Sequence, residues 1–290
     1  MALRAGAGKV GRKGWKAFHL GSYSCPLVGD NRGKDPISQL ETLLREDISP
    51  GSNTSRRNPY KDLDSLYMAI LSQAAEDLES DSVNEMNKVI DTIIQIRSEM
   101  PLDAISHFLG EKAIVVKTAF NRIQSIIPIP TDRSGLIQVY HPSFPDFVTS
   151  RERCPDSRFY VDTLTHERRL AVRCLDILNN QLSKDVETLL KPTEEASSLY
   201  RDALLRTIPL EVQYACRFWA VHVTFSSMSN NDKELMERVD VFSSTMLLRW
   251  VVSMCILDAL SDTIAATRSL QQWIVSLAHP PYLFHLLIAW

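Results

Sequence analysis

The feature that most constrains this chain is a helical spacing of apolar residues that persists over most of its length. From residue 60 onward, apolar side chains recur every three or four positions, as on the buried face of an amphipathic helix. The first stripe consists of Leu63, Leu66, Tyr67, Ile70, Leu71, Ala74 and Leu78. The same period returns after residue 160, with Leu170, Cys174, Ile177, Leu178 and Leu182. This pattern predicts a mainly α protein.

One region departs from the helical period. "LDAISHFLG" and "EKAIVVKTAFNRIQSI" predict two short helices that meet at Gly110, and therefore a helix-turn-helix. Two β-type runs follow, "IIPIP" at 126–130 and "LIQVYH" at 136–141, with the turn "TDRSG" between them. Together these elements predict a winged helix with a small β-hairpin. The spacing of Ser143 and Asp146 then matches a capping box, with Pro145 in the first turn of a new helix.

The predicted elements divide the 290 residues into four segments. Residues 1–35 are basic and lack periodicity, so we expect a disordered or unassigned N-terminus. Residues 36–58 contain one short helix and a polar linker rich in serine, proline and asparagine. Residues 59–150 form the winged-helix-type domain, and residues 151–290 form an α-helical bundle. The chain stays apolar to its last residue, which indicates a truncated form of a longer protein.

The sequence motifs of catalysis and of metal binding are missing. "AGAGKVGRKG" at 5–14 has the composition of a phosphate loop, but Leu3 and Val10 replace its first glycine and its hydroxyl residue. The seven histidines show no HExxH spacing, and the five cysteines form no CxxC pair. We therefore expect no enzymatic activity, no catalytic residue, no metal site and no cofactor. Scattered cysteines in odd number predict a reducing, cytoplasmic setting.

The charge pattern gives little support for a membrane or a nucleic acid as partner. The most apolar segment, Met246–Leu257, is about half the ~20 residues that a membrane span needs, and it contains Arg249. We expect a buried helix there and no membrane association. The net charge is −3, and Glu111 dilutes the basic residues of the second short helix. A winged helix would still contact DNA through Lys112, Lys117, Asn121, Arg122 and, on the wing, Arg133.

Several ordered blocks resemble one family. "YHPSFPDF" and "YACRFWAVH" are the most specific of them, and the others include "DPISQLETLL", "NPYKDLDSLYMAILSQA", "AISHFLGEKAIVVKTAFNRIQSIIPIP" and "VFSSTMLLRWVVSMCILDAL". Over roughly residues 27–275, they resemble the part of fungal NACHT-domain proteins that follows the ATPase core. These proteins are NOD-like signalling NTPases of the STAND class.

The resemblance implies a mechanism and a site residue. In this family the ATPase core holds ADP in a closed state, and the winged helix folds back over the nucleotide. A histidine of the winged helix reaches the ADP phosphate, and exchange for ATP releases this lid. His141 matches that position. An imidazole N–H can donate to a phosphate oxygen. Taken from its own surroundings, His141 is also consistent with a hydrogen-bonded loop residue.

This chain departs from the family in what it lacks. It has no phosphate loop, no acidic Walker B run, and no room for an ATPase core before residue 30. We interpret the helix near residues 36–45 as a remnant next to that core. We therefore expect a non-catalytic regulatory or scaffold module, either a truncated gene model or a stand-alone paralogue. Its expected partners are proteins, an intact NACHT-type NTPase among them. The alternative is a winged-helix nucleic-acid-binding protein.

Overall fold

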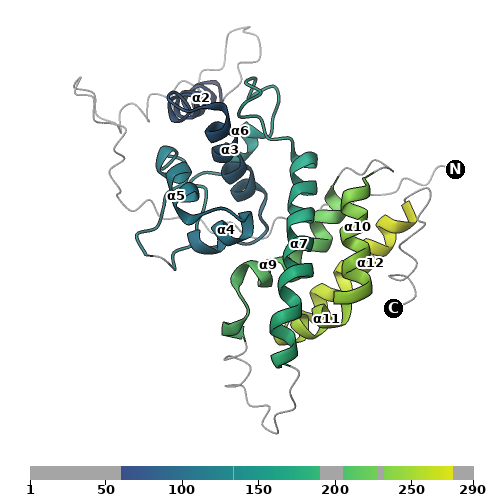
Figure 1. Cartoon of the computed structure of the whole chain (residues 1–290). Coiled ribbons are helices and arrows are strands. Elements are labelled where there is room, and N and C mark those ends of the chain that lie inside the picture. The colour runs from purple at the N-terminus through teal and green to yellow at the C-terminus, as the bar shows by residue number, and fades with distance from the viewer. Residues whose placement is uncertain (1–59, 133, 190–204, 227–231, 277–290) are drawn as a thin grey trace, which may run out of the picture. The chain divides into compact units, whose positions relative to one another are not determined.

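The structure, a computed structural model, describes residues 60–132, 134–189, 205–226 and 232–276. The chain divides into two compact units, Met1–Asn53 and Thr54–Trp290, and every described residue belongs to the second. These residues are mainly helical and form no β-strand beyond one isolated bridge, so the mainly α prediction is confirmed for them (Figure 1). The predicted segments 1–35 and 36–58, the proposed DNA contact Arg133 and the apolar end after residue 276 lie outside the described residues.

The first group of helices covers the region predicted to be a winged helix. It comprises α2 (Lys61–Ala74), α3 (Ser80–Gln95), α4 (Leu102–Leu109), α5 (Ala113–Arg122) and the short α6 (Ser143–Val148). The joint between α4 and α5 is as predicted, because Gly110 ends α4 in the left-handed conformation with φ 74°. The stripe on α2 buries Tyr67, Leu71 and Ala74, whereas Leu66 remains about half exposed.

The predicted β-hairpin is not found among the described residues. A single backbone hydrogen bond joins the two β-type runs, from the Tyr140 N–H to the Ile126 carbonyl at 3.0 Å. The second run instead pairs with the chain before α4, where the Ile137 N–H donates to the Met100 carbonyl and Leu136 bridges to Pro101. The first run, "IIPIP", contains two prolines, which have no N–H to donate to a strand ladder.

The second group of helices follows residue 160. It comprises α7 (Thr163–Leu189), α9 (Leu210–Phe225), α10 (Lys233–Val241), the π-helical turn η3 (Phe242–Met246), α11 (Leu247–Ile256) and α12 (Leu260–Ser276). All five residues of the predicted α7 stripe are buried. The helix α7 contacts α3 and α4 of the first group as well as α9, α10 and α11 of the second (Figure 1).

The expected buried helix near residue 250 is buried on one side only. Trp250 and Met254 of α11 are buried, but Leu248 is 76% exposed. The continuous helix Lys233–Ile256 is, within the described residues, the one segment long and apolar enough to cross a membrane. A single helix of this kind is weak evidence for a span, because core helices often have the same length and composition.

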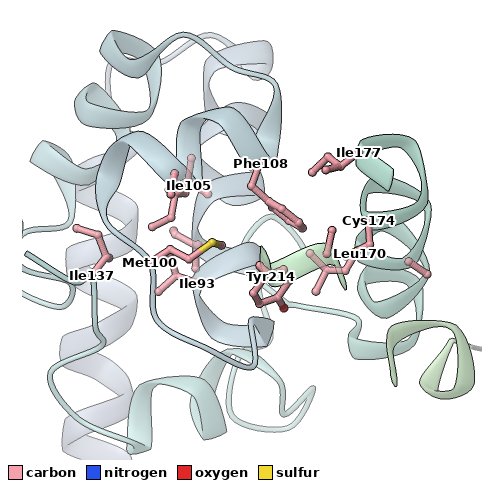
Figure 2. Close-up of a cluster of buried hydrophobic side chains, with 14 of the residues drawn as sticks. Ile93, Met100, Ile105, Phe108, Ile137, Leu170, Cys174, Ile177 and Tyr214 are labelled. Atoms are coloured by element: carbon pink, nitrogen blue, oxygen red, sulfur yellow. The ribbon is translucent and has the colours of Figure 1, made fainter. Parts of the chain in front are cut away.

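One hydrophobic core connects both groups of helices. Figure 2 shows Ile105 and Phe108 of α4 near Leu170 and Cys174 of α7, together with Tyr214 of α9. Farther along the bundle, the rings of Trp219, Phe242 and Trp250 pack against one another, with centroids 4.5–5.9 Å apart. The predicted domain boundary at residue 150 stays a prediction, and buried side chains from both sides of it belong to this core.

Candidate functional site

The predicted site residue His141 directly precedes the short helix α6. The helix begins at Ser143, as expected, but its N-cap residue is Pro142 and no side chain caps it. The capping box is therefore absent. The Ser143 hydroxyl instead lies 2.6 Å from His141 Nδ1 and 2.8 Å from the Tyr67 hydroxyl of α2. Ser143 is buried, so its hydroxyl serves to connect the histidine to the core.

These contacts fix which ring nitrogen of His141 carries the proton in the neutral form. The Ser143 backbone N–H donates to Nδ1 at 3.1 Å, and an N–H can only donate. Nδ1 is therefore an acceptor, and the neutral imidazole carries its proton on Nε2. Because the His141 side chain is exposed, this Nε2–H is available to an incoming acceptor.

The support behind His141 is a packed aromatic cluster. The Tyr67 ring lies 5.2 Å from the Phe144 ring and 5.5 Å from the Phe147 ring, and both phenylalanines are fully buried. Beside them, Arg153 donates to both carboxylate oxygens of the buried Asp64, which ties the chain after α6 to α2. His141 therefore lies next to a well-packed part of the structure, and a precise contact at this junction needs such packing.

Four of the five residues predicted to contact DNA lie in the described part of the chain, and two of them, Arg122 and Asn121, bond within the protein. The Arg122 guanidinium donates to the Ala74 carbonyl at 2.9 Å and so binds the C-terminal end of α2. Lys112 is the N-cap residue of α5, and Lys117 is exposed one and a half turns later. Asn121 accepts a hydrogen bond from Gln124. The basic side chains are therefore separated.

The surface beside Arg122 is mostly apolar. Ile114 is 66% exposed on α5 and, with Leu78 and Met86, lines a cavity of about 190 Å³ whose edge also includes Glu85 and Arg122. An apolar face of this kind suits a protein surface better than a phosphate backbone.

Sequence reasoning missed a buried polar network between the two groups of helices. The His222 ring bonds to Glu167 through Nδ1 at 2.6 Å and to the Tyr214 hydroxyl through Nε2 at 2.7 Å. Arg97 pairs with Glu167, and its backbone N–H donates to Tyr214 at 3.1 Å. Burial lowers the pKa of His222, an effect that Glu167 partly opposes.

The spacing of Tyr214 and His222, two turns apart on α9, is the one signal that the sequence offered for this network. Glu167 lies 55 residues away from His222, and no local pattern connects them.

Metal binding finds no support in the described residues, where no group of three histidine, cysteine or acidic side chains could hold an ion. Comparison of the chain with protein-family models, with curated proteins and with solved structures found no match. The family resemblance therefore rests on the sequence blocks alone.

Proposed function

We propose that this chain is a non-catalytic regulatory and scaffold module of the kind that follows the ATPase core in fungal NACHT-type NTPases. In this proposal it acts as a nucleotide-sensing lid that associates with an intact NTPase, which supplies the nucleotide. The helix-turn-helix joined at Gly110 supports a winged-helix-type lid, although the hairpin predicted for its wing is not found among the described residues.

The observation that carries the proposal is the state of His141. A lid that senses a phosphate needs a hydrogen-bond donor of fixed orientation at its surface. His141 has this property, because Ser143 occupies Nδ1 and leaves the exposed Nε2–H as the donor. A contact worth a few kcal/mol in one of two lid positions is enough to shift a conformational equilibrium.

The proposal is tested by binding. The purified chain, immobilised, is exposed to an intact NACHT-type NTPase loaded with ADP or with ATP, and retention is measured. We expect retention in the ADP state, weakened roughly tenfold by His141→Ala, as for the loss of one charge-assisted hydrogen bond. The control is His107→Ala, which removes another exposed histidine. Equal retention of both variants, or no retention at all, would contradict the proposal.

Two further measurements separate the alternatives. ATP hydrolysis by the purified chain should stay at background, and turnover would overturn its assignment as non-catalytic. A salt-dependent shift of duplex DNA that weakens on Lys117→Glu would favour the nucleic-acid-binding alternative. The bond from Arg122 to α2 and the apolar face around Ile114 argue against this outcome.

A further inference from the structure

A polar cavity lies between α3, the end of α4 and α7. Its volume is about 780 Å³, within the range of small-molecule sites. Most ligand sites are lined by apolar side chains, but this lining is mainly charged and amide side chains, with apolar contributions from Phe108, Leu109 and Leu170. A ligand that fills it therefore needs polar groups to bond with these side chains, as well as some apolar surface.

A histidine without a hydrogen bond forms part of the cavity lining. His166 is 4% exposed, and neither of its ring nitrogens makes a hydrogen bond. Asp91 lies nearby, with one carboxylate oxygen 3.6 Å from Nδ1, which is too far for a hydrogen bond. A buried polar group without a partner costs free energy. The cavity beside it is where a partner would bind.

The ring of His166 is uncharged near neutral pH. Burial lowers its pKa to about 3, and the positive charge of Arg169 adds to this effect. A neutral imidazole offers one donor and one acceptor. A ligand hydroxyl matches either of them, because it can accept from the ring N–H or donate to the other nitrogen, but one hydroxyl cannot reach both nitrogens.

Four cations line the same cavity. Arg158 pairs with Asp156, and Arg173 donates to the carbonyls of His107 and Phe108. Lys88 and Arg169 are exposed, and neither forms a salt bridge with any described residue. Asp81, Glu85 and Asp91 line the cavity too, and the charge of Arg169 acts on Asp91. An anion is therefore favoured only locally, beside Lys88 and Arg169, where the fork of an arginine matches phosphate oxygens.

The remaining lining residues decide between classes of phosphate compound. Asn84, Asp81 and Glu85 of α3 can bond to hydroxyl groups. The aromatic rings of the lining offer little to a nucleobase, because Phe108 is fully buried and Arg151 lies 4.7 Å over one face of the Tyr160 ring. We propose that this cavity binds a small hydroxylated phosphate monoester of the sugar phosphate class, with its phosphate at Lys88 and Arg169 and a hydroxyl at His166.

The test uses the full chain and calorimetric titration. Glucose 6-phosphate is the probe, and glucose and inorganic phosphate are titrated separately. We expect glucose 6-phosphate to bind more tightly than either. Arg169→Gln should weaken it roughly tenfold, the effect of losing one charge-assisted contact. Arg268→Gln is the matched control, since it removes the same charge from the exposed surface of α12, outside the cavity.

Other results would overturn the proposal. It fails if glucose 6-phosphate does not bind, or if the two arginine variants weaken binding equally, which would indicate unspecific attraction. It also fails if inorganic phosphate or glucose alone binds as tightly as glucose 6-phosphate. A second readout does not depend on the arginine variants: the ring resonances of His166 should shift on addition of glucose 6-phosphate and stay unchanged with inorganic phosphate. This site is independent of His141, so its failure leaves the proposed function untouched.

Discussion

Three histidines of the described residues illustrate how the same side chain takes different roles. His141 is exposed and held through Nδ1 by its neighbour in sequence, so it offers a donor to a partner. His222 is buried and bonded on both nitrogens, which makes it a structural residue. His166 is buried and neither of its ring nitrogens makes a hydrogen bond, which is why we propose that a ligand bonds to it. Residue type alone could not separate these roles, because each depends on contacts over different distances in the chain.

We expect the loss of the Ser143 hydroxyl to lower the free energy of unfolding more than the loss of the His141 side chain does. Ser143→Ala leaves the buried Tyr67 hydroxyl without this partner and should lower the free energy of unfolding by about 1–3 kcal/mol. Tyr67→Phe in the same background should cost little more, because both partners are then gone. His141→Ala should cost less than about 1 kcal/mol, since the ring is exposed. Urea unfolding of these three variants and of Tyr67→Phe alone measures this, and strictly additive losses for Ser143→Ala and Tyr67→Phe would contradict the coupling.

Asp91 and His166 influence the pH dependence of stability in opposite directions. Burial raises the pKa of Asp91 from 3.8 to about 7, so the folded state binds the extra proton in this window. The free energy of unfolding then falls as pH rises through it. Burial lowers the pKa of His166 from 6.5 to about 3, so the unfolded state binds the extra proton there. The free energy of unfolding rises with pH in that window, and the two contributions oppose each other where the windows overlap.

Single substitutions should reveal the two slopes. Relative to the unaltered chain, Asp91→Asn should make the free energy of unfolding rise more steeply with pH between about 4 and 6, and His166→Asn should make it rise less steeply or fall. Urea unfolding at closely spaced pH values measures both slopes. Other titrating groups, His222 among them, are the same in the two variants, so the difference between slopes isolates this pair. Equal slopes in the two variants would show that neither pKa is shifted as described.

At the scale of elements, the joint between α4 and α5 depends on Gly110. Its φ of 74° is unfavourable for residues with a Cβ, and an added Cβ would lie 2.9 Å from the Arg173 guanidinium. Gly110→Ala should therefore lower the free energy of unfolding by about 1–2 kcal/mol. Gly110→Asn is the matched comparison, because it adds the same Cβ while asparagine tolerates this backbone conformation. The melting temperature should be highest with glycine at position 110, lower with asparagine and lowest with alanine. Equal melting temperatures would exclude backbone strain as the cause.

The helices and their joint could be predicted because their signals are local. Apolar period and a terminating glycine act within a few residues, and α4, α5 and α7 follow them closely. The hairpin prediction was wrong, because the apolar character of "IIPIP" suggested a strand although its two prolines have no N–H to donate to a ladder. The prediction of a capping box was also wrong, since the Ser143 hydroxyl bonds to the hydroxyl of Tyr67, 76 residues away. Contacts of that range leave no spacing in the sequence to detect.

At the scale of the whole described unit, contacts join residues on opposite sides of the predicted boundary at residue 150, and three of them meet at Arg97 and Tyr214. The Arg97 guanidinium pairs with Glu167, and the Arg97 backbone N–H donates to the Tyr214 hydroxyl. The Phe108 and Tyr214 rings lie 5.1 Å apart. Glu167, Phe108 and Tyr214 are buried, whereas the Arg97 guanidinium is not. Buried contacts of this kind couple the stability of the segments that they connect.

We therefore expect the two groups of helices to unfold together. Trp219, Trp250 and Trp273 lie after the boundary and report on the bundle by fluorescence, provided that Trp15, which lies before it, is replaced by phenylalanine. Hydrogen exchange of α2–α5 amides reports on the first group. The two midpoints should coincide. Tyr214→Phe removes two hydrogen bonds from the network and should lower both stabilities equally, by about 1–3 kcal/mol, with the exposed Tyr140→Phe as control. Separate midpoints, with Tyr214→Phe affecting the fluorescence alone, would instead establish two independent domains divided near residue 150.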